Sequence, residues 1–521
     1  MVMFTNKRPG RRAIVGILVA VLLINVYIFG RDRFDATLWI GPIDSQVDIP
    51  DSGSGLRNLV TSLKSGIRPA APLPLAARQE TLLRDLSLQL HEQKPQCSPP
   101  NVDGRVDGVT FDPLNLMPRP DHVVNSDDIQ GPMQEAHDGF VAAINQQKAR
   151  PYNKGTKGIV SSAGGEYLPT FVASLRMIRR TGCQLPVEVF LIDWVEYEPY
   201  ICEVVLPQLN AQCKVLEDIL DVVRDGKGKP SKPIKVEHFQ IKPFAMLLSS
   251  FESFVWLDAD CVPLHDPTVL LDSDPFTSTG LVTWPDFWAN TASSLYFNIS
   301  RQPEPAMTAR AATESGVMLI SKKTQFTTLL LAVYYNYYGP EYYWPLLGQG
   351  AYGQGDKDTF IQAAGALDAS FHTVSEPVVA VERDYDNGAW TFTGMAQADP
   401  MEDYSLTSQD IWRVTNATAA NAPRIFFLHA SNPKFNAALE LVKKSRKGRL
   451  YTRPEDALRR FGYDFEKSYW EEAITVTCTL EHAFDSWKKS SELCEDMQQH
   501  WNQTFSDPDA EAPEFSNNQS I

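Results

Sequence analysis

Two aspartates follow directly on an apolar segment and are spaced so that both can bind one ligand. The segment Ser253 to Pro263 reads SFVWLDADCVP, with Asp258 and Asp260 after the apolar residues 254–257. A short run of apolar, β-favouring residues predicts a strand of a sheet that is covered on both faces. Ligands bind outside the carboxyl ends of such strands, where two carboxylates can hold a divalent cation. An Asp-x-Asp pair also occurs in ordinary turns, so the rest of the chain must decide between the two interpretations.

A histidine and a lysine extend this candidate metal site. His429 ends the apolar segment RIFFLHA (424–430), and Lys434 follows it. A histidine at the end of a strand is commonly a buried imidazole with satisfied hydrogen bonds. Beside Asp258 and Asp260 it would instead complete a mixed oxygen and nitrogen site suited to Mn²⁺. Lys434 would then meet a phosphate as a point charge.

Two glycine-containing segments are candidates for contact with a nucleotide sugar. Gly164 and Gly165 lie between a predicted strand and a predicted helix, where backbone N–H groups can approach a phosphate. The pattern is not GxGxxG and Glu166 would repel a pyrophosphate, so on its own it favours a tight turn. The segment GQGDKD (353–358) opens a predicted helix. Helix capping explains Asp356, while Asp356 and Lys357 together suit a loop that faces sugar and phosphate.

Aromatic residues gather in two stretches, around Trp284 to Trp288 and between Tyr334 and Tyr352. Aromatic rings stack on the C–H faces of sugars, and they also fill protein cores. The sequence leaves both interpretations open for these residues.

Strand and helix patterns alternate around the aspartates, which predicts an α/β fold with a doubly wound, mostly parallel sheet. The expected strands are 158–163, 185–193 and 213–216, and the expected helices are 168–180, 199–209 and 240–251. The last of these helices leads into the strand that ends at Asp258.

The composition describes a globular protein and argues against one class of partner. The chain has 521 residues, of which 43% are hydrophobic, and a formal net charge of −16. Such a charge argues against binding to nucleic acid, which needs a basic face.

The N-terminus predicts a membrane anchor. The residues from Ala13 to Phe29 are almost all apolar, and they follow Lys7, Arg8, Arg11 and Arg12. A helix of this length spans about 26 Å, which is enough for a thin bilayer, and the basic residues would stay on the cytosolic side. A cleaved signal peptide is the alternative, but no small-residue cleavage site follows the apolar run. We therefore expect a cytosolic tail (1–12), a transmembrane signal anchor (13–30), a lumenal stem (31–150), a catalytic domain (151–440) and a helical C-terminal extension with a disordered acidic tail (441–521).

The cysteines and the glycosylation sequons are consistent with a lumenal location of the chain that follows the predicted anchor. None of the seven cysteines forms a CxxC pair, which disfavours a zinc ribbon or a thioredoxin-like site. In an oxidising compartment we expect pairing among Cys183, Cys202 and Cys213, and between Cys478 and Cys494. Four Asn-x-Ser/Thr sequons add weak support.

Six motifs, taken in order, resemble the fungal Golgi α-mannosyltransferases that add α-1,2- or α-1,3-linked mannose (glycosyltransferase family 71). They lie between residues 157 and 435 and include GIVSSAGGEYLPTF, FQIKPFAMLLSSFESFVWLDADCVPLHDP, ESGVMLISKK, YYNYYGPEYY, GQGDKDTF and FFLHASNPKF. The resemblance implies a type II Golgi membrane protein with a GT-A-like domain. It also implies that Asp258 and Asp260 bind Mn²⁺ or another divalent cation together with GDP-mannose. Transfer to a mannose residue of a protein-linked glycan would retain the anomeric configuration.

Several points stay open at this stage. Glu314 and Asp356 are the candidates for orienting donor or acceptor. A transferase that uses a UDP-sugar would suit the same aspartates and histidine. A non-catalytic subunit of a Golgi glycosylation complex is a second alternative, and a complex with other Golgi transferases is a further expectation.

Overall fold

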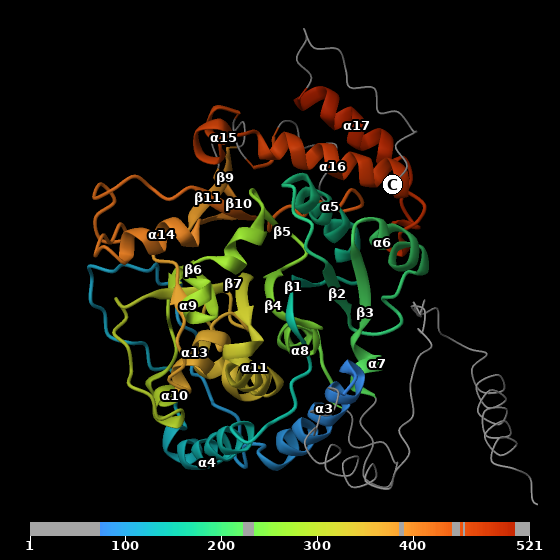
Figure 1. Ribbon diagram of the computed structural model, residues 1–521. Coiled ribbons are helices and arrows are strands. Elements are labelled where there is room, and N and C mark those ends of the chain that lie inside the picture. Colours follow the sequence, from blue (N-terminus) through green and yellow to red (C-terminus); the bar gives the residue numbers. More distant parts are fainter. Residues whose placement is uncertain (1–72, 222–233, 385–389, 440–448, 452–453, 506–521) are drawn as a thin grey trace, which may run out of the picture. The chain divides into compact units, whose positions relative to one another are not determined.

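The computed structural model describes residues 73–221, 234–384, 390–439, 449–451 and 454–505 (Figure 1). The predicted cytosolic tail, the anchor at 13–30 and the first part of the predicted stem lie outside these residues. Among the described residues, none of the helices combines the length and the apolar sequence that a bilayer crossing requires.

A seven-stranded sheet forms the centre of the domain, with strand order β3-β2-β1-β4-β7-β6-β8. The strands β3, β2, β1 and β4 are parallel to one another, and β8 is parallel to β6. Only β7 runs in the opposite direction, because it pairs antiparallel with both β4 and β6. The predicted mostly parallel α/β sheet is therefore confirmed. Its strands are β1 (Asn153–Ser162), β2 (Val187–Leu191), β3 (Ala211–Val215), β4 (Phe251–Leu257), β6 (Leu281–Ala289), β7 (Ala311–Ser321) and β8 (His372–Thr373).

A second, antiparallel sheet begins where β4 ends. Its strand order is β5-β11-β10-β9, with β5 (Cys261–Pro263), β9 (Val379–Asp384), β10 (Trp390–Ala398) and β11 (Ile425–His429). The turn Asp258–Asp260 lies between β4 and β5, so it connects the two sheets. The Asp-x-Asp segment thus occupies the junction between them.

Helices cover both faces of the central sheet (Figure 1). In β4 the buried side chains alternate, since Val255 and Leu257 pack with one core cluster while Phe254 and Trp256 pack with the other. The first cluster includes residues of α5 (Tyr167–Arg180) and α16 (Phe465–Leu480). The second includes residues of α8 (Ile241–Leu248) and α11 (Lys322–Tyr337). The strand that carries the aspartates is therefore buried on both faces, as its apolar sequence predicts.

The shorter helices connect and flank these layers. They are α6 (Leu206–Gln208), α7 (Leu216–Leu220), α9 (Phe276–Thr279), α10 (Ser294–Ile299), α12 (Trp344–Gly348), α13 (Thr359–Ala366), α14 (Pro400–Thr407), α15 (Pro454–Phe461) and α17 (Leu493–Thr504).

The structure differs from the predicted stem after residue 74. Helices α3 (Leu75–Glu92) and α4 (Ser126–Ile144) contribute buried side chains to the second core cluster. The ring of Phe140 stacks on Tyr334 of α11, with 4.2 Å between centroids, and the Tyr334 hydroxyl donates to the carbonyl of Gln93 at 2.7 Å. These helices are a layer of the domain, because their apolar faces are buried against it.

The described part of the predicted C-terminal extension is also built into the domain. The ring of Tyr469 in α16 stacks on Phe435 with 3.6 Å between centroids. Its hydroxyl lies 2.6 Å from the Ser174 hydroxyl of α5. Helices α16 and α17 therefore complete the core beside α5, while the predicted acidic tail after residue 505 lies outside the described residues.

Two disulfides confirm the expected cysteine pairing. Cys202 is bonded to Cys213, and Cys478 to Cys494. Cys97, Cys183 and Cys261 are free thiols.

Replacing Trp470 by alanine should destabilise the whole domain. Trp470 is fully buried and stacks on His500 of α17. The lost contacts and the cavity left behind should lower the free energy of unfolding by about 3–5 kcal/mol, measured by urea titration. Leu458→Ala in α15 is the control, because Leu458 is exposed and should change stability by less than about 0.5 kcal/mol. A small effect of Trp470→Ala would mean that the C-terminal helices fold apart from the core.

Candidate active site

The junction of the two sheets brings three candidate metal ligands together. The Asp258 backbone N–H donates to the carbonyl of Gly316 in β7, and the Cys261 N–H closes a turn onto the Asp258 carbonyl, each at 2.9 Å. In the second sheet His429 is paired in register with Cys261. One ligand atom each from Asp258, Asp260 and His429 lies within 4.8 Å of the others. The predicted spatial cluster is therefore present.

The donor set of this cluster fits a divalent cation. Two carboxylates and one imidazole form the mixed oxygen and nitrogen set that suits Mn²⁺. The His429 Nε2 atom lies 3.3 Å from Asp260, while its Nδ1 atom lies 2.9 Å from the Glu314 carboxylate. A carboxylate on the far nitrogen is the usual support of a metal-binding histidine, since it fixes the ring orientation and the tautomer. Asp258, Asp260 and His429 would hold the cation.

Glu314 lies behind His429 and does not line the cavity described below. Its side chain is almost fully buried, and it accepts hydrogen bonds from the Gly316 N–H at 3.2 Å and from the Gln397 amide at 3.1 Å. The structure thus gives Glu314 a positioning role toward His429, in place of the direct contact with donor or acceptor that the sequence suggested.

The charges of the cluster compensate one another. Burial alone would raise the pKa of Asp260, but His429 and Lys434 hold the pKa of its carboxyl below the ordinary value. Burial likewise opposes protonation of His429, yet Asp260 and then Glu314 hold its pKa well above the usual range. The Lys434 ammonium forms an ion pair with Asp260.

A buried lysine joins the two acidic segments of the site. The Lys242 Nζ atom in α8 lies 3.0 Å from Asp258 and 3.1 Å from Asp356. It also donates to the carbonyl and the hydroxyl of Ser315, at 2.8 and 2.9 Å. Burial would lower the pKa of Lys242, but Asp258 and Asp356 raise it, so the ammonium keeps its charge. Lys242 therefore holds the segment around Asp356 against the Asp-x-Asp turn.

These groups lie along a cavity of about 770 Å³ at the carboxyl end of β4. Among the predicted residues, six line it: Gly164, Asp258, Asp260, Asp356, His429 and Lys434. Others were not singled out from the sequence, namely Tyr167, Glu196, Glu237, His238, Phe239, Lys242 and Ser315. The role of Lys242 could have been predicted from the sequence. It is a lysine inside the apolar helix IKPFAMLL, and a buried lysine needs a partner of opposite charge.

Besides Glu314, two more predicted residues do not line the cavity, namely Lys357 and Gly165. The Lys357 ammonium pairs with Asp286 at 2.8 Å, although its neighbour Asp356 faces the cavity. Gly165 follows Gly164 with a positive φ of 53°, a conformation that favours glycine. Gly164 itself lies against the Glu196 carboxylate, so that an added Cβ would stand 2.1 Å from Glu196.

Cys261, directly after the aspartates, is buried within the junction. Burial raises the pKa of its thiol well above the ordinary value. The thiol is therefore protonated and buried away from solvent.

Comparison with known proteins shows similarity to mannosyltransferases. Residues 156–312 and 304–399 match the family model described as mannosyltransferase (Mannosyl_trans3). The α-1,2-mannosyltransferase MNN21 of Candida albicans is 31% identical over 402 residues, which cover 66% of this chain and 61% of that protein. The α-1,2-mannosyltransferase MNN24 of the same organism is 34% identical, with 58% and 51% covered. The α-1,2-mannosyltransferase MNN5 of Saccharomyces cerevisiae is 29% identical, with 47% and 50% covered. The chain thus spans about half to three-fifths of the length of these curated relatives.

Solved structures with some likeness are glycosyltransferases. GlyE of Streptococcus pneumoniae matches with a TM-score of 0.31 and 11% identity, over 66% of this chain and 63% of that one. The galactosyltransferase LgtC, in complex with donor and acceptor sugar analogues, matches with a TM-score of 0.26 and 13% identity, over 42% and 73%. Neither likeness is close enough to bear on the fold or on the reaction.

Gly316→Ala should weaken metal binding by displacing His429. A Cβ at this position would lie 2.6 Å from His429 Nδ1 and 2.9 Å from the Glu314 carboxylate, so one of these groups must move. Disturbing such support costs about 10–100-fold in metal affinity, which Mn²⁺ titration followed by electron paramagnetic resonance would measure. The matched control is Gly131→Ala in α4, where an added Cβ would meet no atom within 4 Å. Unchanged Mn²⁺ affinity in Gly316→Ala would contradict the claim that the Glu314–His429 contact supports the metal site.

Proposed function

The chain belongs to this mannosyltransferase family, and from that premise we propose that it is a metal-dependent α-mannosyltransferase that uses GDP-mannose. The acceptor in this proposal is a mannose residue of a protein-linked glycan. The observation that carries it is the cluster of Asp258, Asp260 and His429 at the wall of a cavity large enough for a nucleotide sugar.

The cavity offers a cationic environment for a diphosphate. A cation held by Asp258, Asp260 and His429 would neutralise the diphosphate of the donor and stabilise it as a leaving group. Lys434 supplies a second positive charge beside Asp260. The Lys242 ammonium lies 3.0 Å from Asp258, which would keep this carboxylate oriented when a ligand enters.

We propose that transfer retains the anomeric configuration. Asp356 lines the cavity, but its carboxylate lies 3.1 Å from the Lys242 ammonium, which stabilises the anion and makes it a weak nucleophile. Asp356 is therefore better suited to orient a sugar hydroxyl than to form a covalent intermediate. In the proposed reaction the acceptor hydroxyl attacks the anomeric carbon on the face that the diphosphate leaves. A diphosphate oxygen takes up the hydroxyl proton.

The names of the relatives support an α-1,2 linkage in preference to α-1,3. The proposed location is the Golgi membrane, with the predicted anchor at 13–30 and the catalytic domain in the lumen. The two disulfides support an oxidising compartment.

Asp258→Asn and Asp260→Asn should each abolish mannose transfer. Each change removes one charged ligand of the cation, and a loss of at least about a thousandfold in rate is expected from the lost stabilisation of the leaving group. The measurement is transfer to mannobiose from a panel of GDP- and UDP-sugars, with Mn²⁺ and with EDTA. GDP-mannose should be the donor used, and EDTA should stop the reaction.

Asp128→Asn is the control, because this exposed aspartate lies in the first turn of α4, outside the lining of the cavity. Transfer from a UDP-sugar alone would contradict the proposed donor. A folded protein that transfers no sugar from any donor would contradict the enzymatic assignment and favour a non-catalytic subunit.

A further inference from the structure

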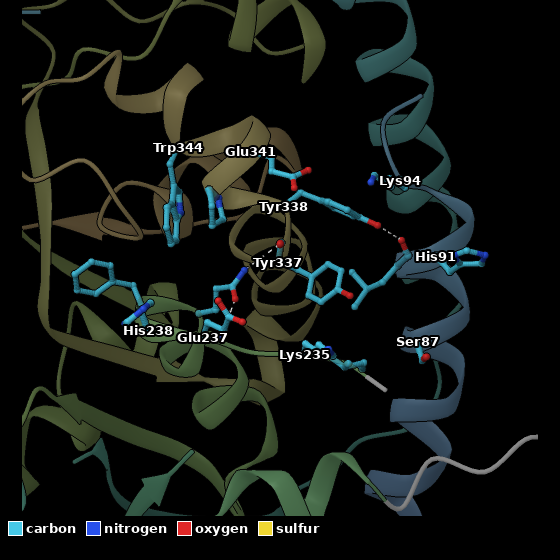
Figure 2. A pocket seen from close by; sticks show the side chains of 15 residues that line it. Ser87, His91, Lys94, Lys235, Glu237, His238, Tyr337, Tyr338, Glu341 and Trp344 are labelled. Carbon is cyan, nitrogen blue, oxygen red and sulfur yellow. Dashed lines mark hydrogen bonds between the residues drawn. The ribbon is translucent and has the colours of Figure 1, made fainter. Parts of the chain in front are cut away.

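A second cavity, of about 730 Å³, lies next to the candidate active site. Its walls come from α3, from the segment 234–240 and from the end of α11 with the residues that follow. Figure 2 shows Ser87 and His91 on α3 and Lys94 just after this helix at one side, with His238 and Trp344 at the other and Tyr337 between them. The volume is within the range of about 300–1,000 Å³ that small-ligand sites occupy.

The two cavities share one short wall. Glu237, His238 and Phe239 line both of them. The adjacent Gln240 amide donates to the carbonyls of Asn336 and Tyr337, each at 3.0 Å, and so fastens this wall to α11. Two residues further, Lys242 contacts Asp258. A ligand in the second cavity therefore lies one peptide segment away from the proposed metal and donor site.

The aromatic stretch between Tyr334 and Tyr352 divides into a core part and a cavity part. Tyr334, Tyr335 and Tyr343 are buried and do not line the second cavity. Tyr338 touches its wall, but its hydroxyl donates to the Leu90 carbonyl of α3. These residues hold the layers together and do not need a ligand.

Tyr337 and Trp344 instead line the second cavity, together with Phe239, whose side chain is 59% exposed. The Phe239 ring meets Trp344 edge-on, with 6.3 Å between centroids. Tyr337 and Trp344 are half-buried, so each of the three rings keeps some surface toward the cavity. Such rings can stack on the C–H face of a sugar.

The polar groups around these rings include both positively and negatively charged side chains. Lys94 and Lys235 lie on the cavity wall together with Glu237 and Glu341. Such a mixed lining favours a neutral ligand with many hydroxyl groups, because those hydroxyls can both donate to carboxylates and accept from ammonium groups. It disfavours a strongly anionic ligand such as a second nucleotide.

His238 is held in an unusual conformation at the shared wall. Its φ of 47° lies in the left-handed region, and its imidazole forms no hydrogen bond with any described residue. Strained backbone persists where the surrounding structure over-determines it, and it is frequent at ligand sites. Here it directs a residue with free donor and acceptor capacity into both cavities.

We propose that the second cavity binds the acceptor, a neutral mannose-containing oligosaccharide. The sugar rings stack on Tyr337, Trp344 and Phe239, and the reacting end extends past His238 toward Asp258 and Asp260. The identity of the sugar rests on the proposed function. The position of the site rests on the shared wall and on the three aromatic rings that line the cavity.

The experiment measures binding of α-linked mannotriose to the full chain without any donor, by ligand-observed nuclear magnetic resonance titration. Maltotriose is the comparison sugar. Tyr337→Ala and Phe239→Ala should each weaken mannotriose binding by about three- to tenfold, because each removes one stacking surface. Tyr337→Phe should bind like the unchanged protein, since it keeps the ring.

Trp412→Ala is the matched control, because Trp412 is an exposed aromatic residue that lines neither cavity. Mn²⁺ affinity should stay unchanged in Tyr337→Ala, which lines only the second cavity. Thermal melting of each variant checks its folding, and Phe239→Ala serves if Tyr337→Ala does not fold, since Phe239 is largely exposed. Mannotriose affinity that is equal in the unchanged protein, Tyr337→Ala and Phe239→Ala would overturn the inference, and so would the absence of saturable binding.

The outcomes separate this inference from the proposed function. If the protein transfers mannose but the variants keep the KM for the acceptor and the affinity for mannotriose, the cavity assignment fails and the function stands. If the protein transfers no mannose but the variants bind mannotriose more weakly, the cavity assignment stands and the function fails.

Discussion

The structure around the candidate site depends on the ion pairs that stabilise the turn Asp258–Asp260 between the two sheets. Asp258 and Asp260 are like charges close together in a partly buried site, which is costly unless cations face them. Lys242 of α8 pairs with Asp258. His429 at the end of β11 and Lys434 in the segment after it pair with Asp260. These cations come from two distant parts of the chain, so the turn is stabilised only when α8, the central sheet and the second sheet are all assembled.

The same requirement explains the architecture around the turn. Strand β4 ends at the junction because β7 pairs with it up to Val317 and accepts the Asp258 N–H at Gly316. Strand β11 then sets His429 opposite Cys261, and Glu314 from β7 holds the far nitrogen of its ring. The absence of a side chain at Gly316 leaves room for this contact, since a Cβ there would lie within 3 Å of both groups. The candidate metal ligands and their support are therefore fixed by backbone pairing, which places them more firmly than loops would.

The sequence predicted the parts of the site that lie at strand ends. Asp258, Asp260, His429 and Lys434 follow apolar segments, and the carboxyl ends of neighbouring strands meet at one edge. It did not predict the place of Lys357, because the direction of a side chain in a glycine-rich loop depends on a partner, Asp286, that lies 71 residues away. The helices α3 and α4 were assigned to a stem because proline-rich segments surround them, although the apolar residues Leu82, Leu83, Leu86 and Leu90 are spaced for one buried helix face. The disulfides were predictable because the cysteines are few and close in sequence.

The most direct test of this account is anomalous diffraction from crystals of the protein grown with Mn²⁺ and GDP. The account predicts one strong manganese peak within coordination distance of Asp258, Asp260 and His429, about 2.0–2.3 Å from their ligand atoms, with the diphosphate on the cavity side of the ion. A peak elsewhere, or GDP bound in this cavity without any peak at the three residues, would contradict the central claim that the junction of the two sheets is a metal site.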